Sequence, residues 1–121
     1  HEFPMSENAQ QDEIFQVMRR FELRPGAEAT WDAAFRERIE AAASAPGWLG
    51  VASWAPLEAP VDAPSQRIVV GRWRATADFD AWTGTESYIR TKEILDSCQA
   101  SPPHIEWFRS VMILDEVPAS G

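Results

Sequence analysis

Two predicted strands, one near each end of the chain, carry apolar side chains on both of their faces. In residues 14–23, Val17 and Phe21 lie on one face and Met18 lies on the other, because side chains alternate along a strand. Residues 104–114 likewise place apolar side chains at odd and at even positions. A strand of this kind is covered on both faces. Because 121 residues have room for only one core, we expect a second copy of the chain to cover the second face.

The segments between these strands show helical and strand patterns in turn. Apolar residues at spacings of four, four and three predict a helix over residues 27–45 that ends before Pro46. The residues of this stripe are Trp31, Phe35, Ile39 and Ala42. The other predicted elements are strands at 48–54 and 66–74, a short helix at 77–83 and, after Gly84, a helical stretch at 86–98.

Together the elements follow the order β-α-β-β-α-β, which is the plan of the ferredoxin-like fold. We therefore predict an α+β domain with an antiparallel four-stranded sheet over residues 13–115, paired with a second copy into a dimeric α+β barrel. Residues 1–12 are expected to be a tag remnant and a flexible arm, with a native start at Met5. Residues 116–121 are expected to be a flexible tail.

Charge and residue usage exclude several classes of function. A net charge of −8 argues against nucleic acid and membrane surfaces as partners. No apolar run reaches the roughly 18–20 residues of a membrane span, and the single cysteine, Cys98, suits a reducing cytoplasm. Apart from His1 the only histidine is His104, so a dedicated metal site is not expected. We expect a cytoplasmic protein that uses no cofactor.

Six tryptophans are the outlier in the composition. They are spread along the chain as Trp31, Trp48, Trp54, Trp73, Trp82 and Trp107. Large aromatic side chains serve core packing and oligomer interfaces, and they also line pockets for planar ligands. The composition leaves both interpretations open.

Three motifs between residues 14 and 114 carry a family resemblance. FELRPG (21–26) leads into the first predicted helix, APGWLG (45–50) leads into the second strand, and VGRWRATADFDAW (70–82) joins the third strand to the next helix. In this order the chain resembles the antibiotic biosynthesis monooxygenase domain of the dimeric α+β barrel superfamily. The resemblance implies oxygenases that use neither metal nor flavin and that oxidise aromatic polyketides, quinols or anthrones. Such chemistry needs a closed apolar pocket, a group that holds an enolate or phenolate, and a nearby proton acceptor.

The tryptophan of the third motif, Trp73, matches one that lines the substrate pocket in related enzymes. It would serve equally well as an anchor of the core. Strand alternation puts Val69 and Gly71 on the same face, toward the helices. Gly71 would leave room there for a ligand.

Arg19 shares its predicted strand face with the apolar Val17 and Phe21. A charge in such a place needs an anionic partner or water. The partner is either an acidic side chain at the sheet edge or the carboxylate, phenolate or enolate of a substrate. Tyr88, the only tyrosine, lies on a helical stripe that faces the sheet. It is either a core tyrosine or a hydrogen-bond donor to a bound oxygen atom.

Three positions depart from the pattern of the relatives. Some polyketide oxygenases carry an asparagine and a tyrosine where this chain has Val69 and Phe79, so an obvious hydrogen-bonding pair is missing. Heme-degrading relatives bind iron through a histidine where this chain has Lys92, which is a poor iron ligand when protonated. The polar groups left to act on a substrate are Arg19, Tyr88, His104 and Arg109.

The residues and the resemblance together predict one site between the helices and the sheet. Its catalytic residues are Arg19, which steadies an anion, Trp73, which stacks on the substrate ring, and Tyr88. Its substrate-binding residues are Val17, Phe21, Trp31, Phe35, Val69, Gly71, Phe79, Trp82 and His104. The predicted reaction is a cofactor-independent monooxygenation of an aromatic polyketide, anthrone or quinol-type molecule by dioxygen. The alternatives are a cyclase or isomerase on the same scaffold, and a non-catalytic dimer that binds a ligand or heme.

Overall fold

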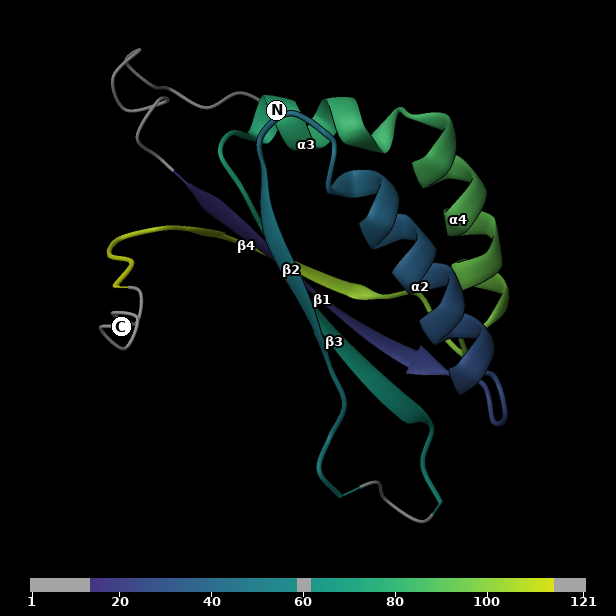
Figure 1. Ribbon diagram of the computed structural model, residues 1–121. Coiled ribbons are helices and arrows are strands. Elements are labelled where there is room, and N and C mark those ends of the chain that lie inside the picture. The colour runs from purple at the N-terminus through teal and green to yellow at the C-terminus, as the bar shows by residue number, and fades with distance from the viewer. Residues whose placement is uncertain (1–13, 59–61, 115–121) are drawn as a thin grey trace, which may run out of the picture.

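The predicted ferredoxin-like α+β fold is confirmed by the computed structural model, which describes residues 14–58 and 62–114 (Figure 1). The predicted arm and tail lie outside the described residues. One antiparallel sheet of four strands carries all the helices on one face. In chain order the elements are β1 (Phe15–Leu23), α2 (Glu28–Ala42), β2 (Trp48–Trp54), β3 (Ser65–Trp73), α3 (Thr76–Thr83), α4 (Glu86–Ser97) and β4 (His104–Arg109).

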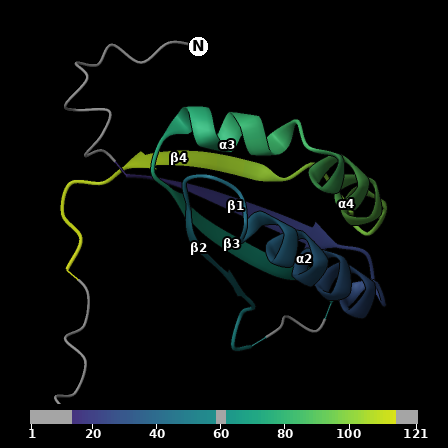
Figure 2. The same cartoon turned by 45° about the horizontal axis from the view of Figure 1, so that its top comes forward.

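The strands lie side by side in the order β2-β3-β1-β4, so the middle of the sheet is formed by β3 and β1. The antiparallel register of these two strands places Val17 opposite Gly71 and Arg19 opposite Val69. These residues share the face that the helices cover. On the same face α3 lies beside β4 (Figure 2), where the rings of Phe79 and Trp107 meet edge to face with centroids 5.4 Å apart.

The helical region after β3 consists of two helices, as predicted, because the chain leaves helical geometry after Gly84. Thr85 is extended, with φ −77° and ψ 156°. Its hydroxyl oxygen accepts a hydrogen bond from the backbone N–H of Tyr88 at 3.3 Å. This cap satisfies one of the free donors at the start of α4. Together with the extended Thr85 it makes α4 a separate helix from α3.

The predicted end of the last strand is wrong, because β4 stops at Arg109 and does not reach Leu114. Its neighbour β1 begins at Phe15, which pairs with Arg109. One further hydrogen bond joins the Ser110 N–H to the Ile14 carbonyl at 2.9 Å. Among the described residues, β4 has no backbone partner beyond this point, and a strand needs one to continue.

The first helix also ends earlier than predicted, at Ala42 rather than Ala45. The N–H groups of Ser44 and Ala45 donate to the carbonyls three residues back, at 3.4 and 2.8 Å. Bonds of this kind tighten the end of a helix and stop its regular pattern. The turn delivers the chain to Gly47 and the start of β2.

The side chains between the helices and the sheet form two apolar clusters. The first contains Phe21, Leu23, Trp31, Ala34, Phe35, Val69, Leu95 and Cys98. The second contains Phe15, Val17, Ala42, Trp73, Phe79 and Trp82. Two arginines lie at the junction of the clusters: Arg19 between Val17 and Phe21 on β1, and Arg38 between Phe35 and Ala42 on α2.

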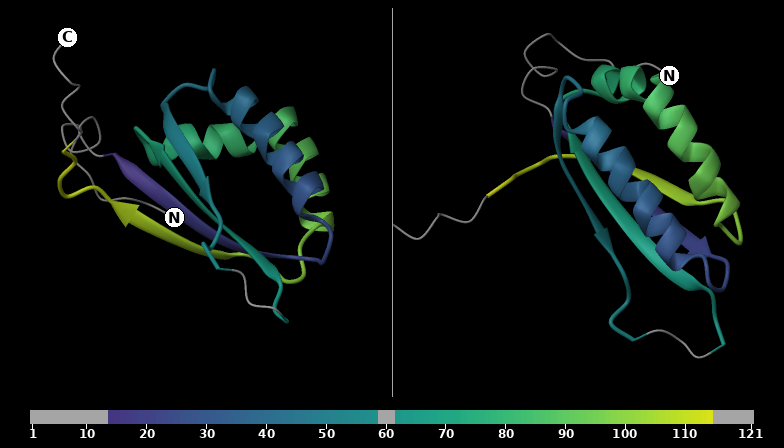
Figure 3. Two further views of the ribbon diagram at one scale, coloured as in Figure 1. Left: turned by 60° about the horizontal axis from the view of Figure 1, so that its bottom comes forward. Right: turned by 45° about the vertical axis from the view of Figure 1, so that its right-hand side comes forward.

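The opposite face of the sheet is covered by none of the described helices (Figures 1 and 3). Near its centre Met18 of β1 pairs with Val70 of β3, and both are half-buried. Phe108 of β4 and Trp54 of β2 are 44% and 60% exposed. The homodimer predicted from the two-faced strands would cover this apolar face.

Gly47, at the start of β2, is expected to be the least replaceable glycine of the chain. Its φ is +82°, and an added Cβ would overlap the carboxyl group of Asp78. Gly26 is a matched control, because its φ is +80° but nothing lies within 4 Å of an added Cβ. We expect Gly26→Ala to lower the free energy of unfolding by about 1 kcal/mol and Gly47→Ala by roughly 2–3 kcal/mol, measured by urea denaturation. Equal losses would mean that Asp78 moves aside freely.

Candidate functional site

A narrow cavity of about 30 Å³ lies between α2, α3 and the sheet. This is roughly the space that one water molecule occupies in the liquid. The predicted site residues that line it are Val17, Arg19, Phe35, Gly71, Trp73, Phe79 and Trp82. The structure therefore brings these predicted residues together around one space, which is too small for an aromatic ring unless side chains move.

Arg19 reaches this cavity from β1. Its Nε atom is enclosed and has no hydrogen-bond partner. Burial lowers the pKa of Arg19, and interaction with the Tyr88 side chain partly opposes that change. Among the described residues no carboxylate forms an ion pair with Arg19. The acidic partner at the sheet edge that we considered is therefore not found in this part of the chain.

Arg38 reaches the same cavity from α2 and is 4% exposed. Its Nε donates to the Thr91 hydroxyl and a terminal nitrogen donates to the Tyr88 carbonyl, both at 2.9 Å. Burial, and then the positive charge of Arg19, lower its pKa to about 10. Both arginines still carry a proton at neutral pH, so two cations, Arg38 buried and Arg19 half-buried, line one small space.

Tyr88 closes one side of this polar junction. The guanidinium carbon of Arg38 lies 4.0 Å from the centroid of its ring, a cation–π contact. The edge of the same ring meets Trp82 with centroids 5.8 Å apart. Tyr88 is half-buried and does not itself line the cavity, so it is a neighbour of the predicted site and holds Arg38.

Trp73, Phe79 and Trp82 form the aromatic side of the cavity. The ring centroids of Trp73 lie 5.6 Å from Phe79 and 6.4 Å from Trp82. A methyl group added at Gly71 would meet Val17 and other neighbours at 3.7–3.8 Å, an ordinary contact distance. The glycine therefore leaves room for about one methyl group, which is less than the sequence led us to expect.

Several predicted site residues lie elsewhere. Phe21, Trp31 and Val69 belong to the first apolar cluster and do not line the cavity. His104 is exposed on β4, with its Nε2 3.0 Å from a carboxylate oxygen of Glu106. The structure does not bring His104 to the cavity.

Lys92, at the position of the iron-binding histidine of heme-degrading relatives, is also outside the cavity. It is exposed on α4 and pairs with Asp96 at 2.6 Å. Within the part of the chain that the structure describes, no three His, Cys, Asp or Glu side chains gather as a metal site would need.

Arg38 is the most important residue that sequence reasoning missed. It lies seven residues after Trp31 and three after Phe35, so helical spacing places it on the buried stripe. That signal was present in the sequence, but an arginine among apolar positions was not counted as part of the stripe. Other missed residues that line the cavity are Ile39, Ala42, Trp48 and Val51.

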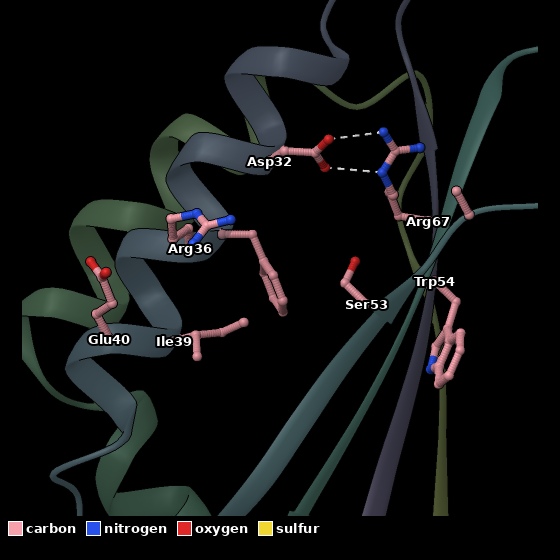
Figure 4. A pocket seen from close by; sticks show the side chains of 9 residues that line it. Asp32, Arg36, Ile39, Glu40, Ser53, Trp54 and Arg67 are labelled. Carbon is pink, nitrogen blue, oxygen red and sulfur yellow. Dashed lines mark hydrogen bonds and ion pairs between the residues drawn. The ribbon is translucent and has the colours of Figure 1, made fainter.

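A wider groove of about 530 Å³ lies outside the cavity, between α2 and the strands β2 and β3 (Figure 4). Asp32 of α2 and Arg67 of β3 span it with two hydrogen bonds of 2.9 and 3.0 Å. Phe35 and Ile39 line both the groove and the cavity. These two side chains therefore lie between the narrow cavity and the wider groove.

Comparison with known protein families shows to which family the chain belongs. Residues 14–94 match the sequence profile of the family described as antibiotic biosynthesis monooxygenase. The chain belongs to the antibiotic biosynthesis monooxygenase family. This confirms the family suggested by the three motifs. No curated protein sequence matches the chain at a significant level.

Solved structures share the fold of this family member. A conserved protein from Methanosarcina mazei Go1 has a TM-score of 0.73 at 14% identity, covering 84% of this chain and 96% of its own. SnoaB from Streptomyces nogalater, a cofactor-independent oxygenase, has a TM-score of 0.69 for its N63A mutant at 18% identity, covering 87% of this chain and 99% of its own. Rv0793 from Mycobacterium tuberculosis has a TM-score of 0.65 at 18% identity, covering 85% and 97%. At these identities the likeness concerns the fold alone.

None of the helices in the described part of the chain is both long and apolar enough to cross a membrane.

Proposed function

We propose that this protein is a monooxygenase that oxidises an aromatic polyketide, anthrone or quinol-type molecule with dioxygen and without a cofactor of its own. One observation carries the proposal: a cavity in a member of this family is lined by Trp73, Phe79 and Trp82 and holds the guanidinium of Arg19. The fold is shared with SnoaB, which is a cofactor-independent oxygenase. The single cysteine, Cys98, which is buried and free, suits a reducing cytoplasm.

The proposed reaction needs no outside reductant. When a ring CH₂ group becomes a carbonyl, the substrate gives up four electrons, one oxygen atom enters the product, and the other leaves with the two hydrogens as water. The first step is loss of a proton to give a ring anion, which then passes an electron to dioxygen. Arg19 would stabilise that anion, because a cation in a closed site acts more strongly than one in water.

Entry of a substrate requires the cavity to widen. Phe35 and Ile39 stand between the cavity and the outer groove. Ile39 is only partly buried, so it can move with little loss of packing. We propose that the ring enters from the groove, displaces these side chains and stacks on Trp73.

An oxygen electrode tests the proposal directly. Purified protein is mixed with an anthrone or a naphthoquinol under air and under nitrogen, and oxygen uptake and product absorbance are followed. We expect enzyme-dependent oxygen uptake that matches product formation one to one. No oxygen-dependent turnover of any member of the panel would overturn the proposal.

Trp73→Phe is expected to lower kcat/KM by up to about 10-fold, because one indole stacking contact is worth roughly 0.5–1.5 kcal/mol. Trp31→Phe is the matched control, since Trp31 is a buried tryptophan of the first cluster that does not line the cavity. We expect the control to keep kcat/KM within about two-fold of the wild type. Equal losses in both variants would mean that Trp73 acts only through packing.

A cyclase or isomerase remains the second candidate because of Val69 and Phe79. Both are buried, at 0% and 7% exposure, where some polyketide oxygenases carry polar side chains. An enzyme of this kind would need proton transfer and no oxygen. Turnover at the same rate under air and under nitrogen would favour it over the monooxygenase.

We further propose that the functional unit is a homodimer in which the uncovered faces of two sheets pack together. Met18, Ile68 and Val70 are half-buried on that face, and Phe108 is 44% exposed. Polar side chains such as Glu106 and Gln16 lie among them. Exposed apolar side chains bordered by polar ones are typical of a protein interface. Sedimentation analysis of the wild type should give twice the mass of one chain.

A further inference from the structure

Two arginines without an acidic partner, Arg38 fully buried and Arg19 half-buried, are an unusual feature of the interior of this protein. Arg19 comes from β1 and Arg38 from α2, and both line the same cavity of about 30 Å³. They are close enough for the charge of Arg19 to lower the pKa of Arg38. Two like charges in an apolar interior destabilise the fold unless something negative lies near them.

The described chain does not supply that negative charge. None of the ion pairs found there includes Arg19 or Arg38. Asp96 has a weak electrostatic effect on Arg38, but it is exposed and pairs with Lys92. Arg38 uses its donors on the Thr91 hydroxyl and the Tyr88 carbonyl, which are neutral groups. The Nε of Arg19 is left with no acceptor at all.

We propose that the ligand of this cavity is a hydroxy-substituted aromatic carboxylic acid whose carboxylate binds between Arg19 and Arg38. This inference deepens the proposed function and rests on it for the reaction, although binding can be tested alone. A carboxylate accepts from the planar fork of an arginine with good geometry, and such bonds are among the strongest in proteins.

The shape of the site agrees with such a ligand. The space beside the two guanidinium groups suits a single small polar group, whereas the walls nearby are the apolar rings of Trp73, Phe79 and Trp82. A carboxylate would occupy the polar space, and the attached ring would lie against these side chains once Phe35 and Ile39 have moved aside.

The positive charge of the site also agrees with a hydroxy-substituted aromatic acid as the ligand. One carboxylate balances only one of the two cations. The phenolate or enolate that forms beside it during the proposed reaction would balance the other, so the pair of arginines would favour the ionised substrate over the neutral one. This is the reason for proposing a hydroxy-acid instead of a simple acid.

Calorimetric titration of the full chain with 1-hydroxy-2-naphthoate, and with its neutral amide as the matched ligand, tests the proposal. We expect the acid to bind at least about 10-fold more tightly than the amide, since a charge-assisted hydrogen bond contributes this much or more. Equal affinity for the two ligands would overturn the proposal.

Arg19→Gln is the decisive variant, because it removes the guanidinium whose Nε has no partner and gives up only the polar interaction with the Tyr88 side chain. We expect it to weaken acid binding by roughly 10- to 100-fold and to leave amide binding nearly unchanged. Arg74→Gln, at an exposed position just after β3, removes the same charge away from the cavity and should change neither. Equal weakening in both variants would show that general surface charge attracts the acid, and would overturn the proposal.

Arg38 needs a milder substitution, because its hydrogen bonds join α2 to α4. Arg38→Lys keeps the charge and loses the planar fork, and its folding is checked by the thermal unfolding midpoint, Tm. We expect a folded protein that binds the acid about 10-fold more weakly, with the amide unaffected. A folded Arg38→Lys variant with wild-type affinity for the acid would remove Arg38 from the site.

The two proposals fail in different ways. Tight, Arg19-dependent acid binding without oxygen uptake would support the anion site and contradict the monooxygenase. Oxygen-dependent turnover of a neutral anthrone, with no preference for the acid, would support the monooxygenase and contradict the anion site.

Discussion

Replacing Trp31 by alanine is expected to lower the free energy of unfolding by about 3–5 kcal/mol, the usual loss for a large buried aromatic side chain. Trp31 is completely buried. Its ring stacks on Phe35 with centroids 4.9 Å apart and packs at a tilt on Phe21 at 5.1 Å. The contact with Phe21 joins α2 to β1, so the cavity left behind would weaken the packing of the helix on the sheet.

Trp31→Phe is the informative control. The Nε1–H group of Trp31 is buried and has no hydrogen-bond partner. Losing an unsatisfied donor relieves roughly 1–3 kcal/mol, which offsets much of the lost packing. We therefore expect a net loss of no more than about 1.5 kcal/mol, measured by urea denaturation at one protein concentration. Similar losses for phenylalanine and alanine would mean that the indole N–H has a partner after all.

Val70→Glu is expected to convert the proposed dimer into monomers. Val70 lies near the centre of the uncovered sheet face, paired with Met18 on one side and Ala52 on the other. A two-fold interface would bury the new carboxylate once in each subunit. At roughly 3 kcal/mol for each unpaired buried charge, the dissociation constant should rise by about 10⁴-fold.

Ile89→Glu provides the matched control for this experiment. Ile89 is 53% exposed on α4, on the helical side of the molecule, so the same change of charge should leave the dimer intact. Analytical ultracentrifugation across a range of concentrations measures both variants. A Val70→Glu protein that remains dimeric would place the interface on another surface.

Much of the fold was predictable because buried apolar side chains recur at a regular spacing along each helix and strand. Alternation in β1 placed Val17, Arg19 and Phe21 on one face, and the register of β1 with β3 confirms that this face looks toward the helices. The stripe that includes Trp31 and Phe35 predicted α2 in the same way. Such patterns depend on neighbours a few residues apart, so they can be read without knowing the rest of the structure.

The candidate site was predictable only in part. Trp73 and Arg19 were identified from one motif and one strand face, and both line the cavity. The role of His104 was inferred from its residue type, and the structure places it on an exposed strand, away from the cavity. Residue type alone does not determine which side of a sheet a strand end faces.

By itself the sequence determined the order of the elements, the faces of the central strands and the family of the chain. The tertiary structure decided where β4 ends, because a strand stops where none of the described residues beside it supplies a further hydrogen bond. It also decided that Arg38 lines the same cavity as Arg19 and donates a hydrogen bond to Thr91, a residue 53 positions away in the chain. This arrangement arises from the packing of α2 against α4 and the sheet. It cannot be predicted from the spacing of residues along the sequence.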